Sequence, residues 1–376
     1  MKYIDEFRDG RAARRVAEKI AAEADPGRRY HFMEFCGGHT HAISRYGILD
    51  LLPKGVEMIH GPGCPVCVLP AGQIDSAIRL AERPDVTLCT YADLMRVPAS
   101  NRTSLMTAKA AGADIRMVYS TLDALAIAEA EPDRQVVFFA IGFETTTPPT
   151  ALAIKAARAK GLGNFSVFCN HVLTPAAITA ILDAQEDGGV RLEGFVGPAH
   201  VSTVIGTRPY EPIAAKYRKP VVVAGFEPLD VIQAILMLVR QANDSRAEVE
   251  NEYSRAVTRD GNRLAQAQTE EVFVLRDTFE WRGLGEIPNS ALKLRDAFAA
   301  FDAETRFGVD YRPAPDNPAC ECGPVLRGVK KPTDCKLFGT ACTPETPMGS
   351  CMVSSEGACA AHWTYGRFRD APRKSA

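Results

Sequence analysis

The sequence predicts an α/β fold in which two parallel-sheet α/β domains are followed by a C-terminal cysteine-rich domain. From about residue 29 to residue 245, short β-branched or aromatic runs alternate with alanine-rich helical stretches. Beyond about residue 259 this alternation stops. Six of the eleven cysteines then fall within 40 residues near the end of the chain. These observations indicate parallel βαβ units first and a region organised by sulfur afterwards.

Eight apolar runs are expected to form strands, and helical patterns follow most of them. The expected strands are residues 30–35, 56–60, 86–90, 115–119, 136–141, 166–169, 195–196 and 221–224. The expected helices among them include residues 73–82, 122–131, 150–160 and 175–185. Later in the chain we expect a long helix over 228–257, a strand over 272–275 and a helix near 291–301.

Eight strands are many for one sheet, so two smaller α/β domains are expected. Proline and charge interrupt both periodicities at Glu131-Pro132-Asp133, which is the expected boundary. This gives a first α/β domain over residues 1–133, a second over 134–245 and the cysteine-rich domain over 246–376. The N-terminal helix is expected to pack on the C-terminal domain.

Composition excludes several classes of protein. A net charge of −2 and a pI near 6.4 argue against a general nucleic-acid or anionic-membrane binder. The start of the chain is polar and lacks the apolar core of a secretory signal, and no apolar run is long enough to span a bilayer. We therefore expect a cytoplasmic protein, in which cysteines act as metal ligands or redox thiols rather than structural disulfides.

The first motif with chemical potential is Cys36-Gly37-Gly38-His39-Thr40-His41, between an expected strand and a helical pattern. Ligands bind at the carboxyl ends of parallel strands, and a helix N-terminus is expected to lower the pKa of the thiol. The glycines allow a close backbone approach, and His39 and His41 offer imidazole donors. A transition-metal half-site or a nucleophile site fits this pattern. A buried cysteine beside helix-capping histidines is the alternative.

The second motif is Gly61-Pro62-Gly63-Cys64-Pro65-Val66-Cys67, again after a strand. The C-x-x-C spacing can close a small disulfide ring, and one thiol at a helix start is expected to be unusually acidic. A redox or metal-binding pair formed by Cys64 and Cys67 is therefore predicted. An inert structural pair is the alternative.

The third motif, Gly142-Phe143-Glu144 followed by three threonines, places a carboxylate and hydroxyls at another strand exit. A helix cap formed by Thr147 before Pro148 explains the threonines but not Glu144, which stays a candidate site residue. The same tripeptide recurs as Gly225-Phe226-Glu227 after a later strand, either as a weak repeat or as reuse of a favourable strand exit. His171 and His200 also follow strands, and each is more simply a satisfied polar residue than a ligand.

The fourth motif is the cysteine-rich tail. Its members are Cys320, Cys322, Cys335, Cys342, Cys351 and Cys359. An all-thiol set suits an iron–sulfur cluster better than the mixed ligands of catalytic zinc, so the third domain is expected to be an iron–sulfur domain. Residues one apart on an extended chain point to opposite sides, so only one of Cys320 and Cys322 faces a cluster easily. The six tail cysteines can therefore supply four cluster ligands and leave one pair of cysteines over.

The chain has no phosphate-binding loop with Gly-Lys-Ser/Thr, no dinucleotide fingerprint and no nucleophile elbow. The four motifs in this order, with the ending Gly349-Ser-Cys-Met-Val-Ser-Ser-Glu-Gly-Ala-Cys359, resemble the HypD family of hydrogenase maturation proteins. The resemblance covers roughly residues 29 to 365. At the cysteines the sequence follows the family pattern throughout.

The resemblance implies a scaffold that works with the small chaperone HypC and carries an iron with two cyanides and one carbon monoxide toward [NiFe]-hydrogenase. Cyanide comes from HypE, which works with HypF. Cys36 is then the thiolate that faces the iron, and Cys64 and Cys67 form a redox pair near the same cleft. The family spacing C-x14-C-x6-C-x16-C selects Cys320, Cys335, Cys342 and Cys359 as ligands of a [4Fe–4S] cluster. Cys322 and Cys351 remain as a possible disulfide, and exchange of Cys320 for Cys322 stays open.

A second hypothesis makes the protein a cluster-dependent disulfide reductase that acts on a diffusible substrate. The Cys-Gly-Gly-His-Thr-His motif separates the two hypotheses, because a reductase does not need it. The sequence leaves the source of the carbon monoxide, the oligomeric state and any turnover on this chain undecided.

Overall fold

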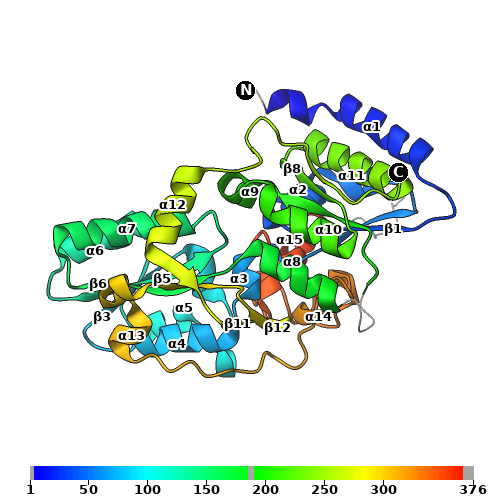
Figure 1. Cartoon of the computed structure of the whole chain (residues 1–376). Coiled ribbons are helices and arrows are strands. Elements are labelled where there is room, and N and C mark those ends of the chain that lie inside the picture. The colour runs from blue at the N-terminus through cyan, green and yellow to red at the C-terminus, as the bar shows by residue number, and fades with distance from the viewer. Residues whose placement is uncertain (1–3, 185–189, 367–376) are drawn as a thin grey trace.

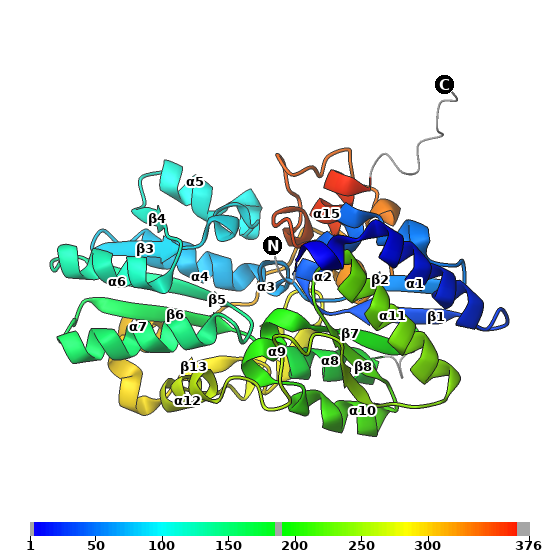
Figure 2. The same ribbon diagram turned by 90° about the horizontal axis from the view of Figure 1, so that it is seen from above.

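The structure is a computed structural model that describes residues 4–184 and 190–366. Within these residues the two main sheets are parallel throughout. Sheet A has the order β2 (Val56–His60), β1 (Tyr30–Glu34), β7 (Gly194–Pro198), β8 (Val221–Ala224) and β9 (Val249–Asn251). Sheet B has the order β4 (Ile115–Met117), β3 (Val86–Thr90), β5 (Gln135–Gly142) and β6 (Phe165–His171). Figure 2 shows the two sheets at opposite ends of the molecule.

The eight expected strands are all present, but the expected boundary between the sheets is wrong. Strand β5 lies beyond residues 131–133 and pairs with β3, while β7 returns to pair with β1. Sheet A is therefore built from the first and the later strands, and sheet B from the strands between them. Strand pairing joins residues far apart in the chain, so an interruption of local periodicity does not mark it.

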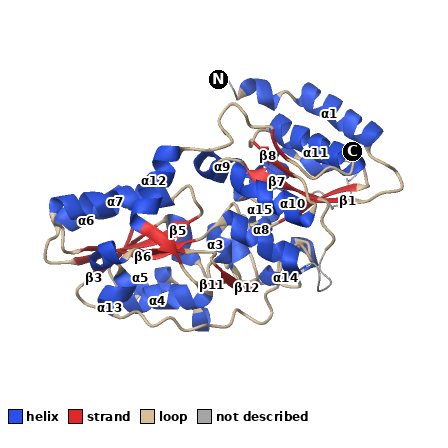
Figure 3. Ribbon diagram, in the orientation of Figure 1, coloured by secondary structure: helices blue, strands red, loops and turns tan. Residues whose placement is uncertain are grey.

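Helices cover both faces of these sheets (Figures 1 and 3). In the first part of the chain they are α1 (Gly10–Glu23), α2 (Gly37–Tyr46), α3 (Pro65–Val68), α4 (Ala71–Ala81), α5 (Leu105–Ala110), α6 (Thr121–Ala130) and α7 (Thr147–Lys160). Those that follow are α8 (Thr174–Asp183), α9 (Ala199–Ile205), α10 (Glu211–Tyr217), α11 (Pro228–Asn243), α12 (Arg263–Val272), α13 (Ala303–Phe307), α14 (Cys322–Leu326) and α15 (Ala358–Tyr365).

Alternation of side chains along the strands produces the cores. Phe32 faces the core beneath α1 and α11, whereas the next residue, Met33, faces a core that also contains Phe139 and Phe168 of sheet B. Burial of such side chains is the main stabilising contribution, at roughly 1.5–3 kcal/mol for each large apolar side chain. One continuous apolar core therefore connects the two sheets.

Helix α1 lies along α11 (Figure 1), not on the cysteine-rich region as expected. The Glu23 carboxylate accepts two hydrogen bonds from Arg240, each 2.7 Å long, and the Glu23 carbonyl accepts one from Asn243. The apolar face of α1, with Ala13, Ala17 and Ile20, joins the core of sheet A. The periodicity of α1 showed that it has an apolar face but not which helix covers it.

Two further expectations after residue 228 are corrected. Helix α11 ends at Asn243 and does not reach residue 257, because the chain turns at Ser245 (φ 54°) and adds β9 to the edge of sheet A. Residues 291–301 form strand β13 (Leu292–Leu294) and a 3₁₀ turn rather than one helix. Strand β13 pairs with β10 (Phe273–Leu275), close to the expected strand. Strands β11 (Thr278–Trp281) and β12 (Gly285–Pro288) form a hairpin.

Residues 246–376 are thus not one separate domain. Helix α12 packs on α7, and β13 and α13 pack on β6, so this part of the chain belongs with sheet B. The cysteine-rich region is present after residue 319 and contacts α2 and α3 instead. It lies between the two sheets, against the loops that carry the Cys36 and Cys64 motifs.

Candidate functional site

Cys36 lies where strand β1 ends and helix α2 begins. It has an extended backbone (φ −152°) and is 8% exposed. Its carbonyl accepts the first helical bonds, from the N–H of His39 at 2.9 Å and of Thr40 at 3.1 Å. The expected position of this thiol, on a strand-to-helix loop at the carboxyl edge of a parallel sheet, is confirmed.

Cys64 and Cys67 lie beside this loop because β2 is the neighbour of β1. The N–H of Gly37 donates to the Gly63 carbonyl at 3.0 Å. A Cβ atom on Gly63 would be only 2.3 Å from the Cys36 nitrogen, so only glycine permits this approach. The two sulfurs of Cys64 and Cys67 are joined in a buried disulfide. The structure therefore brings the first two motifs together, while the acidity of the reduced pair stays a prediction.

Glu34, which sequence reasoning missed, connects the residues of the Cys36 loop. This carboxylate is fully buried. It accepts hydrogen bonds from the Cys36 N–H at 3.0 Å and from the Thr40 hydroxyl, and His60 Nδ1 lies 2.9 Å from Oε1. A charged residue near the end of an otherwise apolar strand was the signal that could have identified it.

The thiol of Cys36 does not have the low pKa that the helix start suggested. Burial raises its pKa well above the ordinary value, and the carboxylates of Glu356 and Glu34 raise it further. The N–H groups of Gly38 and His39 act in the opposite direction but are outweighed. Loss of water around a thiolate is a larger effect here than the helix dipole. A cation bound at this position would reverse the balance, because thiol and carboxylates would all be attracted to it.

The two glycines after Cys36 serve close packing. A Cβ atom on Gly37 would lie 2.3 Å from Glu356 Cβ, and one on Gly38 would lie 2.6 Å from the Phe226 ring. Glu356 belongs to the cysteine-rich region and Phe226 follows strand β8. Gly37 and Gly38 therefore let two distant segments close over the Cys36 loop, a role that the motif alone did not reveal.

The histidines of the first motif have different surroundings. His39 is fully buried, and its Nε2 lies 3.0 Å from the carbonyl oxygens of both Ala224 and Gly225. Two carbonyl neighbours require Nε2 to carry the hydrogen, which leaves Nδ1 as an acceptor with no hydrogen-bond partner among the described residues. Burial lowers the pKa of His39, so the ring is neutral. His41 is half-buried and its Nε2 lies 2.9 Å from the Tyr365 hydroxyl.

Phe226 and His200 complete this side of the site and were not predicted as site residues. The Phe226 ring lies 4.9 Å from the His39 ring and 4.1 Å from the His200 ring, measured between centroids. His200 is the second residue of helix α9, which follows strand β7. Sheet order brings β1, β7 and β8 next to one another, which is why these residues meet.

Glu144 is buried and has a structural partner. Its carboxylate accepts hydrogen bonds from the Thr174 N–H at 2.9 Å and hydroxyl at 3.0 Å, and so caps helix α8. Burial raises its pKa to about 7. Burial is the main cause that raises the pKa of Tyr210, and the negative charge of Glu144 is the next. The charge of Cys36 raises the same pKa further. Thr146, not Thr147 as expected, is the N-cap residue of α7, with Thr147 and Pro148 in its first turn.

The cysteine-rich region gathers its thiols around one small pocket. Its sulfur-bearing lining residues are Cys320, Cys322, Cys335, Cys342, Met352 and Cys359. Cys351 is fully buried and exchanges hydrogen bonds with Cys322 and Cys359. Hydrogen bonds with Cys322 and with Cys351 lower the pKa of Cys359 to about 6. Cys322 and Cys351 are neighbouring free thiols here, so their disulfide stays a prediction.

The residues present fit an iron–sulfur cluster by donor type and by enclosure. Five thiols surround a pocket whose other walls include Val325, Leu337 and Phe338, as soft ligands in an apolar setting require. Within the described ranges, no group of three or more His, Cys, Asp or Glu side chains is arranged to hold a single metal ion. Cys320, Cys335, Cys342 and Cys359 would hold the cluster, and it would supply one-electron chemistry there.

The cysteine-rich region reaches the Cys64–Cys67 disulfide through Ser350. The Ser350 hydroxyl donates to the Cys67 carbonyl at 2.7 Å, and Cys67 Sγ lies 3.9 Å from the Ser350 carbonyl oxygen. Cys351 is the next residue. The tail thiols and the two N-terminal motifs thus form one contiguous site between the sheets.

Comparison with known proteins gives consistent matches over the whole chain. A family model described as "HypD: Hydrogenase formation hypA family" matches residues 11–366. The hydrogenase maturation factor HypD of Rhizobium leguminosarum bv. viciae is 73% identical over 377 residues, covering 100% of this chain and 98% of that protein. HypD of Cupriavidus necator is 70% identical, with 99% of each chain covered. HypD of Escherichia coli (strain K12) is 46% identical, with 97% and 98% covered.

Among the described residues, helices are all too short or too polar to cross a membrane.

Proposed function

The chain belongs to the HypD family of hydrogenase maturation factors, and we propose that it holds and carries the iron group of [NiFe]-hydrogenase during its assembly. The cargo is an iron with two cyanides and one carbon monoxide. A HypC-type small chaperone shares the iron, and HypE, working with HypF, donates the cyanide. The family resemblance supplies these partners, and the geometry of the Cys36 loop supports the holding role.

The position of Cys36 is the observation that carries this proposal. Its thiol is buried and lies in the field of two carboxylates, Glu34 and Glu356. His39 adds an unpartnered Nδ1 on the same loop. A soft thiol with nearby anionic groups and a neutral imidazole is suited to an iron cation, and the enclosure protects diatomic ligands from water.

The second part of the proposal concerns electrons. Cys320, Cys335, Cys342 and Cys359 are proposed to bind a [4Fe–4S] cluster, and the Cys64–Cys67 pair is proposed to be redox-active. The hydrogen bond from Ser350 to the Cys67 carbonyl, which joins the pair to the cysteine-rich region, supports this. A dithiol pair stores two electrons, whereas a cluster delivers them singly, so the two suit a stepwise reduction at the Cys36 loop.

Infrared spectroscopy of the protein co-purified with its HypC-type partner tests the holding role. Cys36→Ser replaces a soft donor by a hard one of similar shape, and the cyanide and carbonyl bands should disappear. Cys169→Ser is the matched control, because Cys169 is equally buried and its thiol only donates to the Leu292 carbonyl at 3.3 Å. Retention of the bands at full intensity in Cys36→Ser would show that the iron is held elsewhere, with Cys64 and Cys67 as the next candidates.

Iron analysis of the anaerobic protein tests the cluster. We expect about four irons per chain and a broad absorption at about 400 nm. Cys342→Ala should remove the colour, while Cys89→Ala, in the core of sheet B, should not. Separate Cys320→Ala and Cys322→Ala variants decide which of the two is a ligand. A colourless protein with one zinc per chain would rule the cluster out.

A disulfide reductase is the second candidate, and the Cys64–Cys67 disulfide beside the cysteine-rich region favours it. Its test is steady-state reduction of a small diffusible disulfide by the reduced protein. Turnover that needs Cys64 and Cys67 but not Cys36 would support the reductase. Dependence of hydrogenase maturation on Cys36 would support the scaffold.

A further inference from the structure

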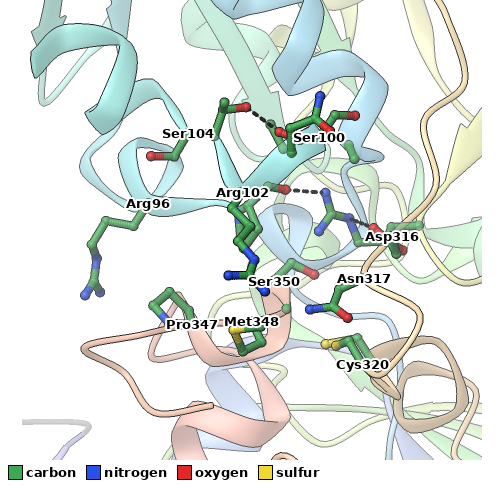
Figure 4. Close-up of a pocket in the computed structure, with 18 of the residues that line it drawn as sticks. Arg96, Ser100, Arg102, Ser104, Asp316, Asn317, Cys320, Pro347, Met348 and Ser350 are labelled. Atoms are coloured by element: carbon green, nitrogen blue, oxygen red, sulfur yellow. Dashed lines mark hydrogen bonds and ion pairs between the residues drawn. The ribbon is translucent and has the colours of Figure 1, made fainter. Parts of the chain in front are cut away.

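A second cavity opens on the other side of the cluster cysteines, and the proposed function makes no use of it. Its volume is about 760 Å³, within the range of roughly 300–1,000 Å³ typical of small-molecule sites. The loop after β3, with residues 98–104, forms one wall, and residues 315–318 and 345–350 form the others. Figure 4 shows this cavity with Cys320 at its edge.

Arg102 extends into the cavity from the first wall. In Figure 4 its guanidinium group points toward Met348. Within residues 4–184 and 190–366, Arg102 makes no hydrogen bond or ion pair. The other two arginines of the cavity both have partners. Arg96 donates to the carbonyls of Pro344 and Val353, and Arg282 donates to those of Leu69 and Pro98.

The backbone that presents Arg102 is strained. Asn101 (φ 54°) and Arg102 (φ 61°) are consecutive residues in the left-handed region, where an arginine is uncommon. Such a conformation costs on the order of 1–3 kcal/mol and persists only where the surroundings fix it. Here the Ala99 N–H donates to the Thr103 carbonyl at 2.9 Å, and Asp75 accepts from the Ser100 hydroxyl at 2.6 Å. The fold therefore holds the arginine in place at an energetic cost.

Asn317 supplies a second free donor from the opposite wall. Its Oδ1 accepts the Ala319 N–H at 3.0 Å, which fixes the orientation of the amide. The Nδ2 group then points toward the middle of the cavity, as Figure 4 shows. Pro98, Met106, Pro347 and Met348 provide apolar surface around these donors. The carboxylates of Asp316 and Glu345 also line the cavity, and that of Asp316 is paired with Arg282 at 3.4 Å. Two free donors beside apolar surface match an oxyanion attached to a small apolar body.

We propose that this cavity binds a small oxyanion-bearing molecule, with Arg102 and Asn317 as its anchors and its body against the wall that holds Cys320. The ligand carries a carboxylate or a phosphate, which present the same oxygen acceptors to a guanidinium group. Bound there, it covers the face of Cys320 that is turned away from the cluster pocket. The site adds a small-molecule ligand to a protein whose proposed cargo is held elsewhere, at Cys36.

Calorimetric titration of the intact anaerobic protein with inorganic phosphate and with citrate tests this proposal. Both are oxyanions, and their relative affinities distinguish a phosphate ligand from a carboxylate ligand. Glycerol, which is neutral, is expected not to bind. At least one anion is expected to bind with a Kd below about 10 mM, and the affinity should decrease with added salt.

Variants then locate the binding. Arg102→Gln should weaken it by about tenfold to a hundredfold, because a charge-assisted bidentate contact is lost. Asn317→Asp keeps the acceptor for the Ala319 N–H but replaces the donor by a negative charge, and should abolish binding. Arg263→Gln removes an exposed arginine outside the cavity and should leave the affinity unchanged. Binding of neither anion by the native protein, or equal affinity in Arg102→Gln, would overturn the proposal.

Discussion

The turn after β5 and the turn after β8 share the residues Gly-Phe-Glu, yet their side chains have different partners. After β5, Phe143 packs near Trp281, with ring centroids 6.1 Å apart, and Glu144 caps helix α8. After β8, Phe226 lies between two histidine rings, and Glu227 near the surface pairs with Arg8. The first turn is fully used in holding sheet B together, whereas the second forms a wall of the candidate site.

The same contrast separates the histidines of the two sheets. Both ring nitrogens of His171, at the end of β6, have threonine partners, at 3.3 Å from Thr146 and 3.1 Å from Thr150. His39 has partners for one nitrogen only. Unused bonding capacity in a buried group is costly unless a ligand satisfies it. At equal burial, the two histidines therefore differ in unused bonding capacity, and the free nitrogen belongs to His39, next to Cys36.

The largest effect is expected from Gly38→Ala. The added Cβ would meet the Phe226 ring at 2.6 Å, so the wall of the site must shift. We expect loss of hydrogenase maturation in cells and destabilisation of about 1–3 kcal/mol in thermal unfolding. Gly163→Ala, on the sheet B side, adds a Cβ that meets nothing within 4 Å and should change neither. Full maturation by Gly38→Ala would show that the position of Phe226 is not critical.

The histidine pair gives the next test. Gln at position 39 can still donate to the Ala224 and Gly225 carbonyls but has no counterpart of Nδ1. His39→Gln should therefore keep its stability and lose most maturation activity. His171→Gln should lose about 1–3 kcal/mol of stability, since two buried bonds are disturbed, and mature hydrogenase normally. Thermal unfolding and hydrogenase activity are the two measurements. The reverse pattern would contradict the assignment of function to sheet A.

Glu144 predicts a pH dependence of stability. Burial raises its pKa from 4.5 to about 7, so the folded state keeps a proton that the unfolded state releases. Its contribution is complete below pH 4.5 and is lost as the pH rises through about 7. At about pH 8, Glu144→Gln should be more stable than the native protein by up to about 3 kcal/mol. The free energy of unfolding across pH measures this, with Glu248→Gln, whose side chain is 62% exposed, as the control. An unchanged profile in Glu144→Gln would mean that Glu144 is ionised in the folded protein.

The smallest effect is expected at the surface pair of the β8 turn. Arg8 lies on the N-terminal segment, is half exposed and donates to Glu227 at 2.9 Å. Exposed ion pairs contribute little, because water and salt screen them. Arg8→Gln should leave the melting temperature of the protein unchanged within error, at low and at high salt. A clear loss would show that the N-terminal segment holds the Phe226 wall in place.

Local sequence was sufficient for the eight expected strands and for the motifs, but not for the end of α11 or for strands β9 and β13. Each of the eight expected strands is present, because a run of β-branched and aromatic residues next to a helical pattern is a local property. The loops carrying Cys36 and Cys64 followed directly from those strands. The four motifs and their order also identified the family, since they depend on residue identity alone. The cysteine spacing gave a proposed ligand set whose four members line one small pocket.

The tertiary structure decided which strands became neighbours and what surrounds each group. The pairing of β1 with β7 crosses more than 150 residues, and no local signal encodes it. That pairing brings His200 and Phe226 to His39 and assigns Glu144 to the other sheet. Burial then sets the chemistry: desolvation raises the pKa of Cys36 although its helix position alone would lower it. Residue types and spacings are written in the sequence, but exposure to water and proximity across the fold exist only once the chain has folded.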